Sequence, residues 1–372
     1  MSTRRVVVLA HEKFPDRSKT ANGVVRYSDD EVVAVLDRDR AGDRVRDHLA
    51  DVQDAPVVEG FEDAVAAAGD VDALVVGIAP IGGGFDDSWR PDVRAAIEHG
   101  ADVVAGLHYF LSDDAEFAAL ADDHGVELHD VRRPPEDVGV AEGRADEVDA
   151  EVVLTVGTDC SVGKMTTTAE LVAAAREAGV DAGFVPTGQT GIMIEGWGTP
   201  VDRVVSDFTA GAVEEMLLER GDDHDVLVVE GQGTIVHPAY SAVTAGILHG
   251  AMADKLVLCH AAGREAIHGY EDTALPSIPS YVDRYESLAA PVHETEVVAG
   301  SLNTKGVGSD DEAREAVADF EAELGVPATD PVRFDAADLA AAVFPERVGR
   351  EGGTGDGGAE TEPKTDGGSE MV

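Results

Sequence analysis

Short apolar runs alternate with longer amphipathic stretches along most of the chain, which is typical of parallel strands joined by helices. In the first third, wholly apolar runs indicate strands that are buried on both faces of a sheet. These runs lie at residues 6–10, 32–36, 73–78, 102–105 and 126–129. Helical spacing between them predicts helices at 43–51, 61–68, 91–99 and 113–124. Residues 1–135 are therefore expected to form a doubly wound, Rossmann-like domain.

The same alternation returns after an acidic segment at 136–150, which we interpret as a linker. Strands are predicted at 152–156, 183–186, 226–230, 255–259 and 296–301, and helices at 166–178, 209–220, 241–252 and 310–324. Residues 151–345 should thus form a second domain. The fold class expected for the chain is α/β, with two doubly wound, mainly parallel three-layer domains. Residues 346–372 are acidic and glycine-rich, and they predict a disordered tail.

A glycine loop with one lysine joins a predicted strand to a predicted helix near the middle of the chain. Successive backbone N–H groups in such a loop form a concave anion site, and the following helix adds the positive end of its dipole. Lys164 supplies a cation, so we expect a pyrophosphate or triphosphate to bind here. The residues expected to contact it are Gly157, Thr158, Asp159, Cys160, Ser161, Val162, Gly163, Lys164, Met165 and Thr166.

The loop differs from the strict motif, in which Gly-Lys is followed at once by serine or threonine. Met165 occupies that position, and Thr166 is the nearest hydroxyl for a magnesium ion. Cys160 lies within the loop, where the sequence is consistent with a nucleophile or with a small packing residue. Cys160 and Cys259 are the only cysteines, too few for a disulfide framework or a cysteine zinc site.

The net charge of the chain limits the kinds of molecule that it can bind. The chain has 74 acidic and 28 basic residues, a formal charge of −46, and only six lysines. Because phosphate backbones require clustered cations, we expect no nucleic-acid partner. Such a surface suits molar salt, where a Debye length of about 3 Å screens repulsion, and it predicts an extreme halophile of the haloarchaeal type. Without a membrane-length apolar run or a signal peptide, a cytoplasmic protein with no membrane partner is expected.

Polar residues follow several predicted strands of the second domain, and parallel strands place such residues at one edge of the sheet. Glu230 ends the strand at 226–230, where phosphate-loop folds carry an acid that orients magnesium. His237 is either structural or a proton carrier. The remaining candidates are Thr187 and Gln189 for substrate, Asp207 as a helix N-cap, substrate contact or metal ligand, Arg264 for a carboxylate or phosphate, and Asn303 for an adenine edge.

The first domain carries a weaker signal. Asp37 ends the second predicted strand, the place of the ribose-binding acid in dinucleotide folds. No Gly-x-Gly-x-x-Gly follows the first strand, however, so a site for NAD is not favoured. The ligand of this domain stays open.

The glycine loop, the Glu-Gly-Gln-Gly strand end at 230–233 and Asn303 resemble the dethiobiotin synthetase branch of phosphate-loop enzymes. That branch carries a Gly-Thr-Asp-Thr-x-Val-Gly-Lys-Thr loop and a Glu-Gly-Ala-Gly strand end. A lysine precedes its Pro-x-x-Thr-Gly segment, where this chain has Val185. The residues that the resemblance implies as linked to magnesium are Asp159, Glu230 and, displaced by one position, Thr166.

From residue 4 to about 345, the chain is similar to a narrower family, DUF1611. This family combines a Rossmann-like N-terminal domain with a phosphate-loop C-terminal domain. The segments that carry the similarity are 157–168, 186–191, 206–211 and 230–238. One branch contains D-glutamate N-acetyltransferases, which pass acetyl from acetyl-CoA to the amine of D-glutamate. The resemblance implies a small amino-acid substrate and a closed homo-oligomer.

Three functions follow from these residues. In the first, an N-acetyltransferase, the loop with Lys164 holds the phosphates of acetyl-CoA, Arg264 holds the carboxylate of an acidic amino acid, and His237 deprotonates the amine. The loop amides or Thr166 stabilise the oxyanion. In the second, an ATP-dependent ligase, Lys164 and Mg²⁺ neutralise the γ-phosphoryl group, and Glu230 orients the metal. The third is a nucleotide-binding regulator. We expect the first, with Lys164, His237 and Glu230 as catalytic residues.

Overall fold

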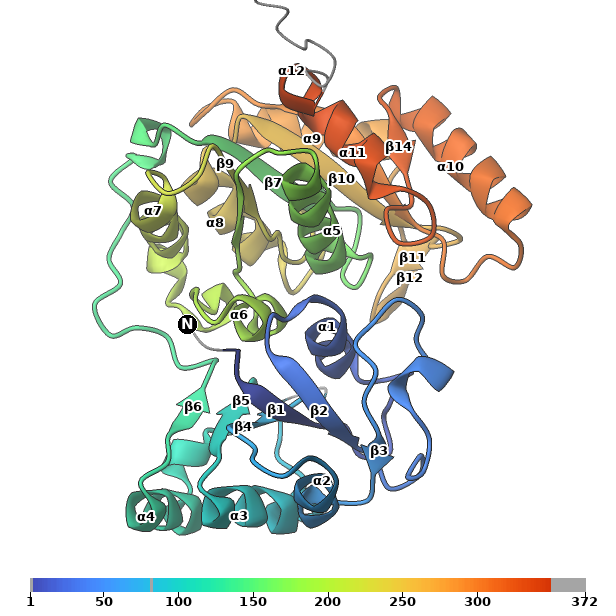
Figure 1. The fold of residues 1–372 in the computed structure, drawn as a ribbon. Coiled ribbons are helices and arrows are strands. Elements are labelled where there is room, and N and C mark those ends of the chain that lie inside the picture. The colour runs from blue at the N-terminus through green and yellow to red at the C-terminus, as the bar shows by residue number, and fades with distance from the viewer. Residues whose placement is uncertain (1–2, 81–82, 349–372) are drawn as a thin grey trace, which may run out of the picture.

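A computed structural model of the protein describes residues 3–80 and 83–348, which form two parallel-sheet domains (Figure 1). In the first domain the strand order is β3-β2-β1-β4-β5-β6, and each neighbouring pair is parallel. The strands are β1 (Arg5–Leu9), β2 (Glu31–Leu36), β3 (Val57–Val58), β4 (Ala73–Val76), β5 (Asp102–Ala105) and β6 (Leu128–Asp130). The central residues of β1, β2, β4 and β5 are buried, as the apolar runs predict, whereas the edge strand β6 is partly exposed.

Helices cover both faces of this sheet. Three of them lie together on the face away from the second domain, and α1 lies on the opposite face, beside the second domain (Figure 1). The four helices are α1 (Lys19–Tyr27), α2 (Phe61–Ala68), α3 (Arg90–His99) and α4 (Ala115–His124). The predicted helices at 61–68, 91–99 and 113–124 are confirmed to within two residues.

The second domain has the strand order β14-β13-β10-β7-β9-β8, again with parallel neighbours. Its strands are β7 (Glu151–Gly157), β8 (Ala182–Val185), β9 (Val226–Val229), β10 (Lys255–Ala261), β13 (Glu296–Asn303) and β14 (Ala328–Thr329). An antiparallel hairpin of β11 (Ala266–Ile267) and β12 (Tyr270–Ala274) follows β10. With both sheets parallel, the predicted α/β fold class is confirmed.

Two separate apolar clusters flank the second sheet. One joins the sheet to α5 and α11, and the other joins it to α7, α8, α9 and α10. The helices of this domain are α5 (Lys164–Glu177), α6 (Gln189–Glu195), α7 (Thr209–Arg220), α8 (Ser241–Ala251), α9 (Ile278–Ala289), α10 (Asp310–Leu324), α11 (Ala336–Val343) and α12 (Pro345–Val348).

The helix predicted at 43–51 is wrong, because only a short 3₁₀ turn, Val45–Asp47, forms there. The backbone N–H of Val45 donates to Ala55 O at 2.9 Å, and Arg44 forms an isolated bridge with Pro56. These tertiary backbone bonds hold the segment extended beside β3, against its local helical spacing. At the other end of the chain, α12 extends past residue 346, where the predicted tail begins, and 349–372 lie outside the described residues.

Helices α1 and α6, neither of which the sequence predicts, pack against each other and join the two domains. A Cβ added at Gly23 would lie 2.8 Å from the Thr190 methyl carbon, so only glycine permits this close approach. The hydroxyls of Thr20 and Thr190 are 2.9 Å apart and buried, and the Tyr27 hydroxyl donates to Glu170 at 2.7 Å. The domains therefore share a packed interface.

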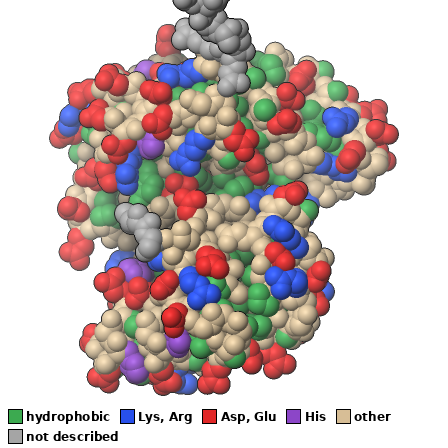
Figure 2. Space-filling model, viewed as in Figure 1, with side chains coloured by type: hydrophobic (Ala, Val, Ile, Leu, Met, Phe, Trp, Pro, Cys, Tyr) green, Lys and Arg blue, Asp and Glu red, His purple; other side chains and the backbone are tan. Residues whose placement is uncertain are grey.

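The segment predicted as a linker is tied to the second domain by backbone hydrogen bonds. The carboxylate of Glu214 accepts the N–H groups of Glu142 and Arg144, each at 2.6 Å. Acidic side chains are scattered over both domains on the face shown in Figure 2. Among the described residues, every helix is too short or too polar to cross a bilayer.

Candidate functional site

The loop at 158–163, between β7 and α5, has the backbone shape of an anion site. Ser161 has φ of +56° and Gly163 has φ of +115°, so left-handed conformations occur twice within three residues. Such alternation turns successive N–H groups toward one point, which forms the nest that phosphates occupy. For Ser161, a residue with a side chain, this conformation is strained, and strain of this kind is concentrated at ligand sites.

Helix α9 braces the loop from behind. The hydroxyls of Tyr281 and Tyr285 donate to the carbonyls of Thr158 and Gly157, each at 2.7 Å, and both rings are fully buried. Thr158 also contacts His260 Nδ1 at 2.7 Å. Burial lowers the pKa of His260 to about 4, so its ring is neutral at physiological pH. The two tyrosines and His260 thus fix the first residues of the loop through hydrogen bonds of uncharged groups.

Lys164 begins α5 and is buried, with only 7% of its surface exposed. Its ammonium donates to the carbonyl oxygen of Asp159 at 2.9 Å, so the side chain curls back along the loop. Burial lowers the pKa of Lys164, because the ammonium has lost water without gaining an ion pair. A polyanion in the loop would supply the missing negative charge.

The carboxylate of Asp159, fully buried, faces the hairpin and not the loop opening. Its Oδ2 accepts from Arg264 Nη1 and from the backbone N–H of His268, both at 2.8 Å. Its Oδ1 accepts from the N–H of Cys160 at 2.7 Å. Both oxygens are thereby used within the protein. This arrangement departs from the roles predicted for these residues, a magnesium link for Asp159 and a substrate carboxylate for Arg264.

Replacing Asp159 by alanine is expected to lower the free energy of unfolding by about 2–4 kcal/mol, because it removes a fully buried carboxylate that pairs with a guanidinium and accepts two backbone N–H groups. Urea unfolding measures the difference. Asp207 offers a matched control in the same domain, since it is exposed and makes no side-chain bond with the described residues. Asp207→Ala should change stability by less than about 0.5 kcal/mol. Equal stabilities of the two variants would mean that the Asp159–Arg264 pair does not brace the loop.

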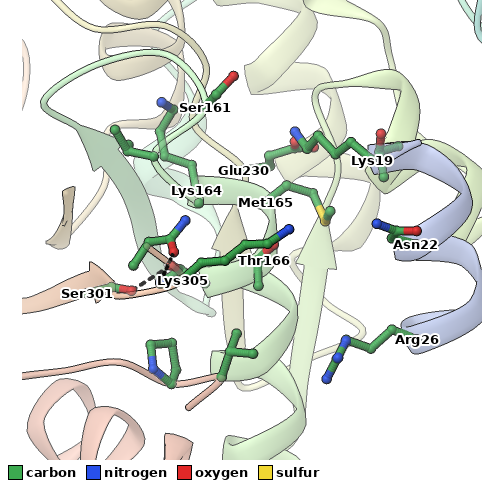
Figure 3. Close-up of a pocket in the computed structure, with 18 of the residues that line it drawn as sticks. Lys19, Asn22, Arg26, Ser161, Lys164, Met165, Thr166, Glu230, Ser301 and Lys305 are labelled. Atoms are coloured by element: carbon green, nitrogen blue, oxygen red, sulfur yellow. Dashed lines mark hydrogen bonds between the residues drawn. The ribbon is translucent and has the colours of Figure 1, made fainter. Parts of the chain in front are cut away.

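Glu230 follows β9 directly, and its carboxylate lies next to the start of α6. Oε2 accepts the N–H of Gly188 at 3.2 Å, and only 5% of the residue is exposed. Burial raises the pKa of Glu230, although the nearby ammonium of Lys19 opposes the shift. Figure 3 shows Lys19 extending from α1 toward this carboxylate. A raised pKa makes the ionised carboxylate a stronger base, which suits it to accept a proton from a ligand.

His237 is buried beside the loop with both ring nitrogens engaged. Nε2 lies 3.2 Å from the carbonyl oxygen of His268, and Nδ1 accepts the N–H of Ala239 at 3.1 Å. Its ring, the Cys160 sulfur and the Asp159 carboxylate lie within 4.8 Å of one another. Since that carboxylate is already paired, the trio is a poor metal site. Burial raises the pKa of Cys160, which favours the interpretation of this residue as a packing residue in the loop.

A cavity of about 850 Å³ lies between the two domains over the loop, within the size range of ligand pockets. Six basic and three acidic side chains line it, in a chain with a formal charge of −46. Three of the six lysines of the chain are among them. The cavity therefore has the opposite charge balance to the rest of the molecule, which favours an anionic ligand.

Most of the predicted site residues line this cavity. They are Cys160, Ser161, Val162, Gly163, Lys164, Met165, Thr166, Gln189, Glu230 and Asn303. The others lie behind or away from the lining: Gly157, Thr158, Asp159, Thr187, Asp207, His237 and Arg264. Thr187 donates to the carbonyl oxygen of Glu230 at 2.6 Å and so positions that strand end. Asp207 caps no helix, because α7 begins after Phe208 without a side-chain cap.

Sequence reasoning missed the wall that the first domain contributes. Lys19, Asn22 and Arg26 point from α1 into the cavity (Figure 3). Their spacing of three and four residues places them on one face of a helix, which is the signal that was available. The glycine loop lies about 140 residues later in the chain than this helix face. Only the packing of the two domains brings them together.

The residues present fit a magnesium ion only in part. Thr166 and Glu230 offer oxygen atoms toward the cavity, where Mg²⁺ bound to phosphates could keep most of its waters. Asp159 does not fit, because both of its oxygens are bonded to the protein. Thr166 and Glu230 would hold the ion, and it would neutralise phosphate charge.

Two family models match separate parts of the chain. A family model described as a P-loop domain, DUF1611_C, matches residues 139–340, and one described as a Rossmann-like domain, DUF1611_N, matches residues 38–134. A crystal structure of a DUF1611 family protein from Anabaena variabilis is 38% identical, with a TM-score of 0.86, covering 92% of this chain and 100% of that one.

Two curated relatives have a named activity. A D-glutamate N-acetyltransferase from Tritonibacter scottomollicae is 38% identical over 74% of this chain and 81% of its own length. A protein of the same name from Pseudoalteromonas sp is 38% identical over 70% of this chain and 77% of its own length. With its two matched domains and these relatives, the chain belongs to the DUF1611 family, whose Rossmann-like and P-loop domains it carries in that order.

Proposed function

We propose that the protein is an N-acetyltransferase that moves acetyl from acetyl-CoA to the amine of an acidic amino acid such as D-glutamate. The observation that carries the proposal is the basic cavity over the glycine loop, which has a buried carboxylate, Glu230, at one end. The name of the two curated relatives supports the same reaction. An anionic thioester and an anionic amino acid both suit a lining with excess positive charge.

The loop at 158–163 and Lys164 hold the diphosphate of acetyl-CoA. The nest offers N–H donors, and the buried ammonium of Lys164 regains a negative partner when the diphosphate binds. With the diphosphate held there, the thioester arm extends toward Glu230 and Gln189. Holding both reactants in one cavity makes the attack effectively intramolecular.

Glu230 activates the amine, in place of His237, whose ring nitrogens are both bonded within the protein. Its carboxylate accepts a proton from the substrate ammonium and leaves a neutral amine with a free electron pair. Lys19 lies beside Glu230 and pairs with a substrate carboxylate, the role that Arg264 was expected to fill. A cation and an anion side by side thus match the two charges of an amino acid.

Transfer of acetyl from acetyl-CoA to the amine requires no third reactant. The amine nitrogen forms a bond to the acetyl carbon, and the C–S bond to CoA breaks with its electron pair on sulfur. As the amide forms, the nitrogen loses its second proton, and the thiolate takes this proton up to give the free thiol. Products are free CoA and an N-acetylated amino acid. Thr166, whose side chain lies in the cavity, is a candidate donor to the oxyanion.

A second candidate is an ATP-dependent, carboxylate-activating ligase. The specific observation that favours it is Glu230 at a strand end beside the glycine loop, where phosphate-loop enzymes place an acid that orients magnesium. Acetyl transfer requires no metal. A regulator that binds nucleotide without turnover is the third alternative.

One assay separates these functions. The protein is incubated in molar KCl with D- or L-glutamate and either acetyl-CoA or MgATP. We expect free thiol to be released with acetyl-CoA and D-glutamate, without nucleotide. Release of phosphate that depends on the amino acid would overturn acetyl transfer in favour of the ligase. Tight nucleotide binding with neither product would overturn both enzymes in favour of the regulator.

A further inference from the structure

The cavity has two chemically different ends. At one end Lys19 lies beside the buried carboxylate of Glu230, and at the other Lys305 and Arg26 come from opposite domains (Figure 3). Lys305 extends across α5 near Thr166, and Arg26 points inward from α1. The glycine loop forms another part of the lining of the same cavity. A ligand whose phosphates occupy the loop therefore has a second basic region beside it.

Lys305 is held in place by its backbone and not by its charge. Its N–H donates to the side-chain oxygen of Asn303 at 3.0 Å, and Arg333 donates to the carbonyls of Thr304 and Val307 at 3.3 and 3.0 Å. Its ammonium makes no hydrogen bond or ion pair with another residue in the described ranges. The backbone around Lys305 is therefore held by its own hydrogen bonds, and the Lys305 ammonium is available to bind a ligand.

Arg26 is similarly available. One of its N–H groups donates to the carbonyl oxygen of Ala50 at 3.0 Å, which orients the guanidinium, and among the described side chains no carboxylate lies in ion-pair range. Most arginines of the chain that are near the surface do pair with an acid, as Arg44 does with Asp54. In a protein with 74 acidic residues, two unpaired cations facing one space favour an anion between them.

We propose that Lys305 and Arg26 clamp the 3′-phosphate of CoA and so select it over nucleotides that lack this group. The proposal rests on the proposed function. In CoA the 3′-phosphate is on the ribose that joins adenine to the diphosphate. With the diphosphate in the loop and adenine against Asn303, that ribose lies next to Lys305, two residues further along. The two cations thus meet the one phosphate that the loop does not hold.

Calorimetric titration with CoA and with dephospho-CoA tests the clamp. We expect the unmodified protein to bind CoA about 10- to 100-fold more tightly than dephospho-CoA, because two charge-assisted contacts are added. In the double variant Lys305→Gln, Arg26→Gln, the two ligands should bind within about threefold of each other. Dephospho-CoA should bind the variant as it binds the parent, which verifies that the cavity is intact.

Lys13 provides the control, since it does not line the cavity, and Lys13→Gln should keep the preference for CoA. Equal affinities of the unmodified protein for CoA and dephospho-CoA would overturn the clamp and leave the proposed function standing. A preference that survives in the double variant would equally overturn it. If the protein binds ATP but neither CoA nor dephospho-CoA, the proposed function fails, and the clamp fails with it.

Discussion

Replacing Lys164 by alanine is expected to weaken binding of acetyl-CoA about 100-fold. The ammonium is the only basic side chain in the described part of the loop, and it is buried against the carbonyl of Asp159. A hydrogen bond between a charged donor and a phosphate contributes about 1.5–3 kcal/mol, or roughly 10- to 150-fold in affinity. Calorimetric titration with CoA and the KM for acetyl-CoA both report the loss.

The matched control for this variant is Lys13→Ala, which removes a lysine that does not line the cavity. It should leave the KM for acetyl-CoA unchanged. Circular dichroism and urea unfolding verify that the Lys164 variant is folded. Loss of the buried ammonium should not destabilise it strongly, since burial already lowers its pKa and disfavours its charge. Unchanged affinity in a folded Lys164→Ala protein would remove the loop from cosubstrate binding.

Glu230→Gln is expected to lower kcat by about 10²–10⁴-fold and to leave the affinity for CoA nearly unchanged. The substitution keeps the shape of the side chain and removes its ability to accept a proton. Burial raises the pKa of Glu230, so the parent should lose activity as the pH falls through that raised value and the carboxylate becomes protonated. This acid limb of the rate profile should be absent in the variant.

Glu170→Gln is the matched control, because burial also raises the pKa of Glu170 and this residue, which accepts a hydrogen bond from Tyr27, does not itself line the cavity. Its kcat should stay within about threefold of the parent.

Between the unfolded and the raised folded pKa of Glu230, the folded state binds more protons, so stability falls as the pH rises. Glu230→Gln should therefore be at least as stable as the parent at pH 7. Full activity of this variant would exclude Glu230 as the base.

The glycine loop was predictable because its chemistry is contained in consecutive residues. The nest, the lysine and the start of the helix all lie between Gly157 and Thr166, so no tertiary information is needed to recognise them. Glu230 and Asn303 were also predictable, because Glu230 follows β9 and Asn303 ends β13, and parallel pairing aligns these strand ends at one edge. The alternation of strands and helices then predicts that each sheet is parallel.

The rest of the site depends on contacts between distant segments. Arg264 and Asp159 are 105 residues apart, and their pairing withdraws an arginine that the sequence alone offers to the substrate. Tyr281 and Tyr285 support the loop from a helix with no recognised motif. Lys19 reaches the cavity only because α1 packs on α6. Local patterns do not encode which faces of two domains meet.

Properties that depend on the surroundings of the protein stay predictions. These are the cytoplasm at molar salt, the haloarchaeal source, the closed homo-oligomer and the handedness of the amino acid. The acidic surface is consistent with high salt. Activity measured against KCl concentration would test the first of them, with an optimum above about 1 M expected where screening is strongest.

A crystal structure of the protein with bound CoA tests the central claim most directly. The account predicts density for the diphosphate against the N–H groups of residues 158–163 and the ammonium of Lys164, with the thiol arm extending toward Glu230. CoA bound at another surface, with the loop at 158–163 unoccupied, would contradict it.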